Sequence, residues 1–187
     1  MEVDDEIRSY LPDLNQPTTF RQALTHTSGL EGYIPNRDRL SAPDLRHALL
    51  TQLQTTAEVN RKVVYRDVNL LLVGWALEQI AGAPIQTLIT QDVIQPLGLP
   101  TATFTPNPEQ TVPTTYSQAQ GLRQGLVHDP KSAILGSHSG AAGLFASLAD
   151  FVVFTQYLFG QRQSPAWPAW YQQPPKDATA GLGRTLG

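Results

Sequence analysis

The chain has 187 residues, enough for one domain that buries a sizeable core. Hydrophobic residues make up 41% and charged residues 16% of the sequence, a balance that excludes an intrinsically disordered protein. The net charge of −3 offers no basic surface, so we expect no nucleic-acid partner. The absence of cysteine excludes disulfides, a thiol nucleophile and cysteine-bound metals.

The start of the chain is acidic and lacks the apolar core of a signal peptide, since Met1 is followed by Glu2, Asp4 and Asp5. The longest apolar runs are about four residues, far shorter than a membrane span requires. We therefore expect no signal peptide or membrane segment in this chain. As it stands, the sequence indicates a soluble, cytoplasmic chain, and the compartment of a longer parent protein is left open.

The first third predicts short helices joined by turns. Residues Thr19 to Gln22 fit a capping box, which predicts a helix that ends near Leu24. Ser41, with Pro43 close behind it, predicts the start of the next helix. The apolar stripe of that helix comprises Leu45, Ala48, Leu49 and Leu53.

The strongest predicted helix runs from Asp67 to Ala81 and ends at Gly82. It is apolar over much of its circumference, which indicates a buried helix. Another helix is expected from Pro84 to about Gln95.

The second half is less regular. Residues 100–118 are rich in proline and threonine and predict an ordered loop or short strands. Ser147 is expected to cap a last helix that continues through Phe159 and is closed by Gly160. Residues from about 161 to 187 are expected to form a loosely structured tail.

The sequence Tyr65-Arg66-Asp67 stands directly before the strongest helix and is the first candidate for chemistry. A tyrosine that has lost its proton can act as a general base toward a serine hydroxyl. Asp67 could hydrogen-bond a lysine that favours the deprotonated tyrosine. The alternative is that Tyr65 packs in the core and Asp67 caps the helix.

Three other stretches contain polar residues with a structural and a functional interpretation. His138-Ser139-Gly140 could line an oxyanion hole, but the small residues around it favour a tight turn with close backbone approach. His128-Asp129 could be half of a triad, but Asp129-Pro130 favours a turn. His26, in a cluster of Thr and Ser, is expected to be a hydrogen-bonded structural histidine.

The four histidines show no metal-ligand spacing, and no glycine-rich phosphate loop is present. We therefore expect no metal and no cofactor.

Four ordered blocks are spread over about 130 residues: Leu24 to Leu30 (LTHTSGL), Val64 to Gly74 (VYRDVNLLLVG), Pro96 to Phe104 (PLGLPTATF) and Gly143 to Asp150 (GLFASLAD). Together they resemble the class C β-lactamase-like serine hydrolases, which include AmpC-type β-lactamases, penicillin-binding DD-peptidases and related esterases.

This resemblance implies the fold and two site residues. The chain would be mostly α, the helical subdomain of the α/β β-lactamase/transpeptidase-like fold with most of the antiparallel sheet missing, and residues 1–187 would form a single partial domain. Tyr65 would be the general base or proton relay. Asp67 would replace the commoner asparagine that contacts the catalytic lysine and the substrate.

The sequence departs from the family in two respects. No serine has a lysine three residues later, so the Ser-x-x-Lys nucleophile motif is absent. The residues His138-Ser139-Gly140 fit the family's Lys/His-x-Gly motif, but they come before the last helix, where that motif does not belong. We therefore expect a middle fragment that is inactive when isolated. The parent enzyme would act on a small molecule or peptide: a β-lactam, a D-alanyl peptide or an ester. The alternative is a non-catalytic binding module or a decayed gene product of the same family.

Overall fold

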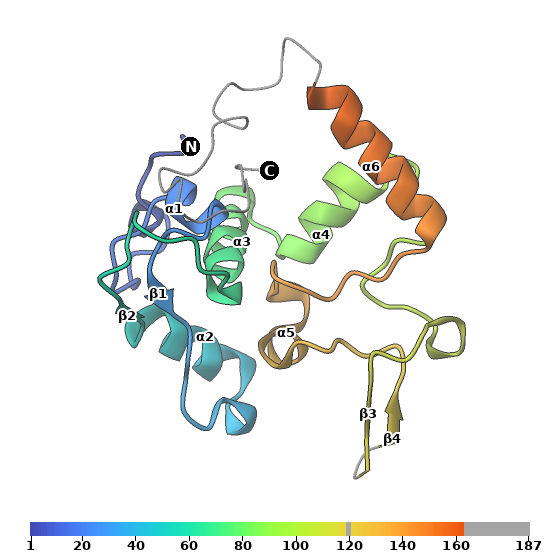
Figure 1. Ribbon diagram of the computed structural model, residues 1–187, viewed down its shortest axis with the longest axis horizontal. Helices are drawn as coiled ribbons and strands as arrows, with labels where there is room; N and C mark the ends of the chain where they lie inside the picture. Colours follow the sequence, from blue (N-terminus) through green and yellow to red (C-terminus); the bar gives the residue numbers. More distant parts are fainter. Residues whose placement is uncertain (119–120, 163–187) are drawn as a thin grey trace.

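A computed structural model describes residues 1–118 and 121–162, and helices predominate in it, as expected (Figure 1). The α-helices are α1 (Phe20–Leu24), α2 (Ala42–Thr51), α3 (Asp67–Ala81), α4 (Ile85–Ile89), α5 (Pro130–Leu135) and α6 (Leu148–Arg162). Shorter turns of helix are the 3-10 segments Ile7–Ser9, Arg37–Arg39, Pro108–Gln110 and Gly136–His138, and the π-helical turn Thr90–Ile94.

The sheets of the described residues are two antiparallel pairs of very short strands. Strand β1 (Leu30–Glu31) pairs with β2 (Gln54–Thr55), and β3 (Thr115–Ser117) pairs with β4 (Gly121–Arg123). The second pair projects away from the helices in Figure 1. The expectation of a mostly α chain with little sheet is confirmed for the described residues.

The helix starts follow the local sequence signals. The hydroxyl of Thr19 accepts a hydrogen bond from the backbone of Gln22, whose side chain accepts one from the backbone of Thr19, so the predicted capping box is present. Ser41 accepts from the backbone of Asp44 at the start of α2. Helix α3 has the predicted bounds, and Gly82 follows it in the left-handed region, with φ of 70°.

Two predicted helices differ from the expectation, one in the type of its last turn and one in its end. The helix expected from Pro84 to Gln95 is α-helical only to Ile89, after which the backbone N–H of Gln95 bonds the carbonyl of Thr90 in a π-helical turn. Helix α6 does not close at Gly160 but continues to Arg162, since a glycine inside a helix costs only about 1 kcal/mol relative to alanine. The rest of the expected tail, residues 163–187, lies outside the described residues.

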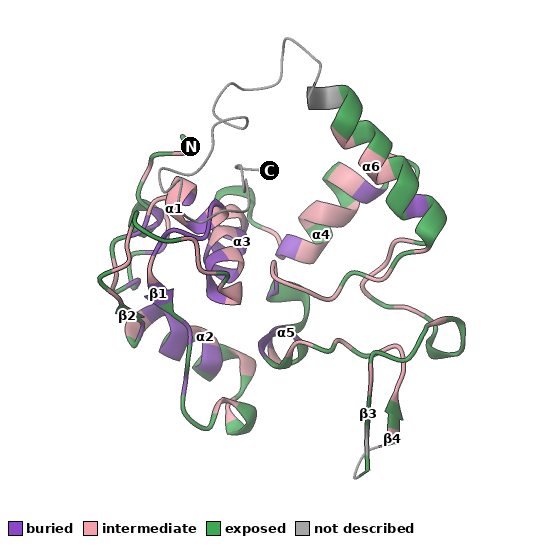
Figure 2. Ribbon diagram, viewed as in Figure 1, coloured by how far each residue is buried: buried purple, intermediate pink, exposed green. Residues whose placement is uncertain are grey.

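The hydrophobic core surrounds α3. Most of its fully buried side chains come from α1, α2 and α3, and they include Phe20, Leu45, Leu49, Leu71, Leu72 and Trp75. Figure 2 shows buried residues along α2 and α3, whereas α6 is largely exposed. Helix α3 was therefore correctly predicted as a buried helix.

No single helix of the described part is long and apolar enough to cross a membrane. Helix α3 and the segment Ile85–Ile94 reach the required length and composition only together, and they are bent by 80° at the break between them.

Candidate functional site

Tyr65 stands in the short connection that leads into α3. Its side chain is 53% exposed, so the alternative in which it packs in the core does not hold. One side of its ring lies against the imidazole of His26, with 4.8 Å between the ring centroids and 46° between the planes. The Tyr65 side chain is therefore accessible, and the contact with the buried imidazole of His26 defines where its ring lies.

Asp67 is the first residue of α3, and both of its carboxylate oxygens are engaged. Oδ1 accepts the backbone N–H of Val68 at 2.8 Å, and Oδ2 accepts Nζ of Lys131 at 2.6 Å. Arg66, the N-cap residue, makes no side-chain cap. Asp67 therefore covers the start of α3, where the helix dipole favours a negative charge, and also holds a lysine.

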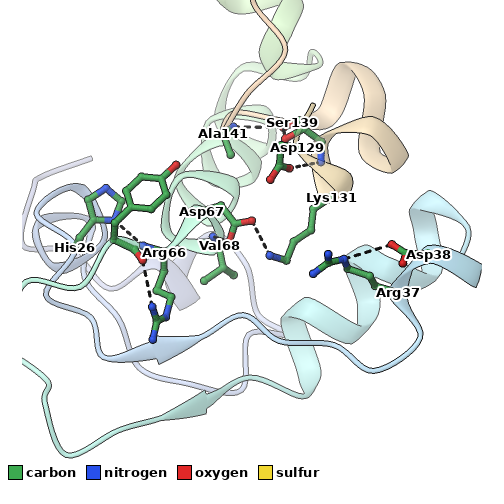
Figure 3. A network of polar contacts seen from close by, with 12 residues as sticks. His26, Arg37, Asp38, Arg66, Asp67, Val68, Asp129, Lys131, Ser139 and Ala141 are labelled. Carbon is green, nitrogen blue, oxygen red and sulfur yellow. Dashed lines mark hydrogen bonds and ion pairs between the residues drawn. The ribbon is translucent and has the colours of Figure 1, made fainter. Parts of the chain in front are cut away.

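Lys131 projects from α5 toward Asp67, as Figure 3 shows, and its side chain is only 9% exposed. Asp129 begins α5 by accepting the backbone N–H of Ser132 at 2.7 Å, and Pro130 occupies the first turn. The Asp129-Pro130 pair was expected to form a turn and instead begins a helix, because the aspartate side chain caps it.

His26 is the hydrogen-bonded, buried histidine that was expected. Nδ1 faces the side-chain amide of Asn69 at 3.1 Å and the backbone N–H of Arg66 at 3.4 Å, while its carbonyl accepts the N–H of Val64 at 2.9 Å. A backbone N–H can only donate, so Nδ1 accepts and the ring proton lies on Nε2. His26 therefore fixes the backbone on both sides of Tyr65.

Ser28 connects the same block to α3. Its hydroxyl donates to Oδ1 of Asn69 at 2.6 Å and accepts the backbone N–H of Leu30 at 3.2 Å. Asn69 is completely buried. The His-Thr-Ser block and the start of α3, which resemble two separate family blocks in the sequence, thus form one hydrogen-bonded unit.

The segment His138-Ser139-Gly140 packs against α3 and α5. The hydroxyl of Ser139 donates to that of Ser132 at 2.7 Å, and the indole N–H of Trp75 donates to the carbonyl of His138 at 2.8 Å. A Cβ on Gly140 would lie 3.0 Å from the carbonyl oxygen of Leu70. These contacts agree with the interpretation as a tight turn with close backbone approach.

A cleft of about 980 Å³ lies between the loop after the π-helical turn and the segment that leads into α6. Asp129 is part of its wall, whereas Tyr65, Asp67 and Lys131 are not. Over the described ranges, no group of three or more His, Asp or Glu side chains could hold a metal ion.

Sequence reasoning did not single out Lys131 or Asn69 as members of this site. Asn69 carries a weak signal, since it is a polar residue inside an apolar helix and must be hydrogen-bonded when buried. Lys131 carries none, because its partner is 64 residues away in the chain.

Comparison of this sequence with known proteins finds related sequences. The chain is 25% identical over 187 residues to Bacillus subtilis (strain 168) PbpX, named as a penicillin-binding protein, with coverage of 98% of this chain and 46% of that protein. It is 28% identical over 223 residues to an Escherichia coli (strain K12) protein named as a D-alanyl-D-alanine carboxypeptidase, with coverage of 96% and 51%. The chain thus spans about half the length of the curated relatives it matches.

The fold agrees with these sequence matches. The structure of EstCE1, described as a hydrolase with promiscuous acyltransferase activity, superposes with a TM-score of 0.71 at 21% identity, covering 96% of this chain and 58% of EstCE1. The described helices are therefore a helical portion of a β-lactamase-like fold. Because the sequence model of the Beta-lactamase family matches residues 1–185, the chain belongs to the β-lactamase family.

Proposed function

We propose that these residues form part of a serine hydrolase in which Tyr65 is the general base of an acyl transfer. The observation that carries the proposal is the turn before α3, where a 53%-exposed phenol stands two residues from an aspartate that is ion-paired to a buried lysine. A buried ion pair beside an exposed acid–base side chain is an arrangement that a catalytic site can use.

In the proposed reaction, the deprotonated oxygen of Tyr65 accepts the proton of a serine hydroxyl while the serine oxygen attacks a carbonyl carbon. The tyrosine then returns this proton to the leaving nitrogen or oxygen as the carbonyl–heteroatom bond breaks. The acyl-serine is released when water attacks it. Asp67 holds the adjacent cationic lysine in place and is not itself a proton acceptor.

The serine of this reaction lies outside the 187 residues, because they contain no Ser-x-x-Lys. We therefore propose that the isolated chain is inactive, since nucleophile and base act as a unit. The proposed substrate is a carbonyl compound among β-lactams, D-alanyl peptides and esters. The names of two relatives, a penicillin-binding protein and a D-alanyl-D-alanine carboxypeptidase, support the first two classes.

The test begins with the isolated chain and its Tyr65→Phe variant, assayed with nitrocefin, a p-nitrophenyl ester and a D-alanyl-D-alanine peptide. We expect equal, background rates. Turnover that disappears in Tyr65→Phe would contradict the proposed dependence on an outside serine.

The second step joins these residues to a Ser-x-x-Lys helix, taken from the codons around the 187-residue reading frame if they encode one. In an active joined protein, Tyr65→Phe should lower kcat roughly 10²- to 10⁴-fold, the usual contribution of a general base. Tyr33→Phe, at another exposed tyrosine, is the matched control. An unchanged kcat in Tyr65→Phe would refute the role of Tyr65. Flanking codons without such a motif would favour a non-catalytic module.

A further inference from the structure

Lys131 and Asp67 form a nearly buried ion pair between two helices that are distant in sequence. The Nζ–Oδ2 distance is 2.6 Å, and the two side chains are 9% and 19% exposed. The other lysine of the described residues, Lys62, is 60% exposed and pairs with Glu58 on the surface. A lysine is seldom buried unless it is paired, so the contact with Asp67 accounts for the burial of Lys131.

Stability alone is a weak reason for such a pair. Removing two charges from water costs about as much as their attraction returns, and apolar residues of similar volume are often equally stabilising. The contact does, however, fix the direction of both groups, because the carboxylate is held at Oδ1 by Val68 and at Oδ2 by Lys131.

Lys131 is itself held firmly by its own helix. Asp129 caps α5, and the buried hydroxyls of Ser132 and Ser139 are joined at 2.7 Å, which ties α5 to the following turn. Lys131 therefore extends toward Asp67 from a helix that is held by the cap at its start and by the hydrogen bond to the following turn.

The turn that carries Tyr65 is consequently held from two sides. On one side, His26 accepts the backbone N–H of Arg66 and contacts the Tyr65 ring. On the other side, Lys131 holds Asp67, two residues after the tyrosine. Figure 3 shows Arg66 and Asp67 between His26 and Lys131.

We infer that Lys131 is a positioning residue for Tyr65, acting through Asp67 and the first turn of α3. The inference rests on the proposed role of Tyr65 in catalysis. When the ammonium group is removed, the poorly solvated carboxylate of Asp67 turns toward water. The first turn of α3 follows it, and Tyr65 loses its place against His26.

The test compares Lys131→Met, Lys131→Arg, Asp67→Asn and the double variant Asp67→Asn/Lys131→Met with the parent chain. Lys62→Met, at the exposed lysine, is the matched control. Melting is followed by circular dichroism, and the position of Tyr65 by NMR of chain labelled with ¹³C-tyrosine. The Tyr65 signal is assigned by its loss in Tyr65→Phe.

Lys131→Met should lower the melting temperature by roughly 10 °C, because it leaves a carboxylate unpaired. Below its melting temperature it should also shift the Tyr65 ring signal and abolish the cross-peak between the Tyr65 and His26 rings. Lys131→Arg should restore that cross-peak. The double variant should change Tyr65 no more than either single variant does, because both act through one contact.

A Lys131→Met chain that melts earlier but keeps the parent Tyr65 signal and cross-peak would overturn the inference and leave the pair as a structural link only. If Lys131→Met does not fold, Lys131→Arg and Asp67→Asn supply the same comparison. The readout needs no turnover, so it is independent of the kcat test: Tyr65 can be positioned by Lys131 even if Tyr65→Phe leaves hydrolysis unchanged.

Discussion

The hydroxyl of Ser28 donates a 2.6 Å hydrogen bond to Oδ1 of Asn69, 41 residues further along the chain. The amide of Asn69 also lies 3.1 Å from Nδ1 of His26. A single buried asparagine thus joins two polar side chains of one segment to the first turn of α3. Such a fully satisfied buried network defines one arrangement of its elements, and a half-satisfied one is costly.

We predict that Asn69→Leu destabilises the chain by about 2–4 kcal/mol, because two buried polar groups lose their partner at once. Urea unfolding followed by circular dichroism measures this difference. Ser28→Ala should cost about 1–3 kcal/mol, since it removes the hydroxyl that donates to Asn69 and accepts the backbone N–H of Leu30. Equal stability of Asn69→Leu and the parent would show that the network is not a determinant of the fold.

Gly140 lies against the backbone of α3 and leaves no room for a side chain. A Cβ there would lie 3.0 Å from the carbonyl oxygen of Leu70 and 3.3 Å from Cα of Gly74. Because backbone atoms of a buried helix cannot move aside cheaply, Gly140→Ala should lower the free energy of unfolding by about 1–3 kcal/mol.

Gly160 in α6 supplies the opposite case, because a Cβ at that position meets nothing within 4 Å. Gly160→Ala should stabilise the chain by about 0.5–1 kcal/mol through the higher helix propensity of alanine. The two variants should therefore move the urea midpoint in opposite directions. A shift of both in the same direction would contradict the packing argument.

Local features were predictable from the sequence because their partners lie within a few residues. The capping box of Thr19 and Gln22, the cap at Ser41 and the bounds of α3 all depend on contacts over three or four positions. The end of α6 was missed because a glycine inside a helix costs only about 1 kcal/mol relative to alanine and does not by itself end the helix. The π-helical turn after Ile89 has no comparable sequence signal.

The candidate site was only partly predictable, for a related reason. The sequence singles out Tyr65 and Asp67 as candidates because they are close together and belong to a block that resembles a known family. Lys131 was not, since a single lysine says nothing about a carboxylate 64 positions earlier. Nor does the sequence show that the ring of His26 lies against Tyr65, because tertiary packing alone brings them together.

Tyr10 provides a pH-dependent test near the N-terminus. Its ring packs edge-on against Phe20, and its hydroxyl donates to Asp5 at 3.2 Å. Desolvation by burial, and then the hydrogen bond to Asp5, raise the pKa of Tyr10 above its ordinary value. The folded state thus holds this proton more tightly than the unfolded state does.

The sign of the effect follows from this difference. The contribution of Tyr10 to stability is fully present below the unfolded pKa of about 10, and it is lost as pH rises through the folded pKa. We predict that Tyr10→Phe makes the urea midpoint fall less steeply between about pH 9 and pH 11. A parallel decline in both chains would show that Tyr10 does not contribute.

Glu78 is the buried carboxylate that connects α3 with three other segments. Oε1 accepts the backbone N–H of Ile85 at 2.9 Å and lies 2.9 Å from Nδ1 of His138, while Oε2 accepts from Arg46 at 3.1 Å. Glu78 is 7% exposed, whereas the side chain of Arg46 is 26% exposed, so water can partly solvate the arginine.

Two substitutions separate the charge of Glu78 from its hydrogen bonds. Glu78→Leu removes the charge and the hydrogen bonds and leaves Arg46 without its ion-pair partner. It should therefore cost about 3 kcal/mol of stability. This value is the lower end of the range for a broken buried pair, because Arg46 is partly exposed. Glu78→Gln keeps an acceptor for Ile85 and should cost only about 1–2 kcal/mol. Glu58→Gln, which breaks the exposed pair with Lys62, should change stability by less than about 0.5 kcal/mol. Calorimetric melting of the three variants measures this order of stability. If Glu78→Leu proved as stable as Glu58→Gln, the prediction would be wrong, and α3 would be held to its neighbours by apolar packing alone.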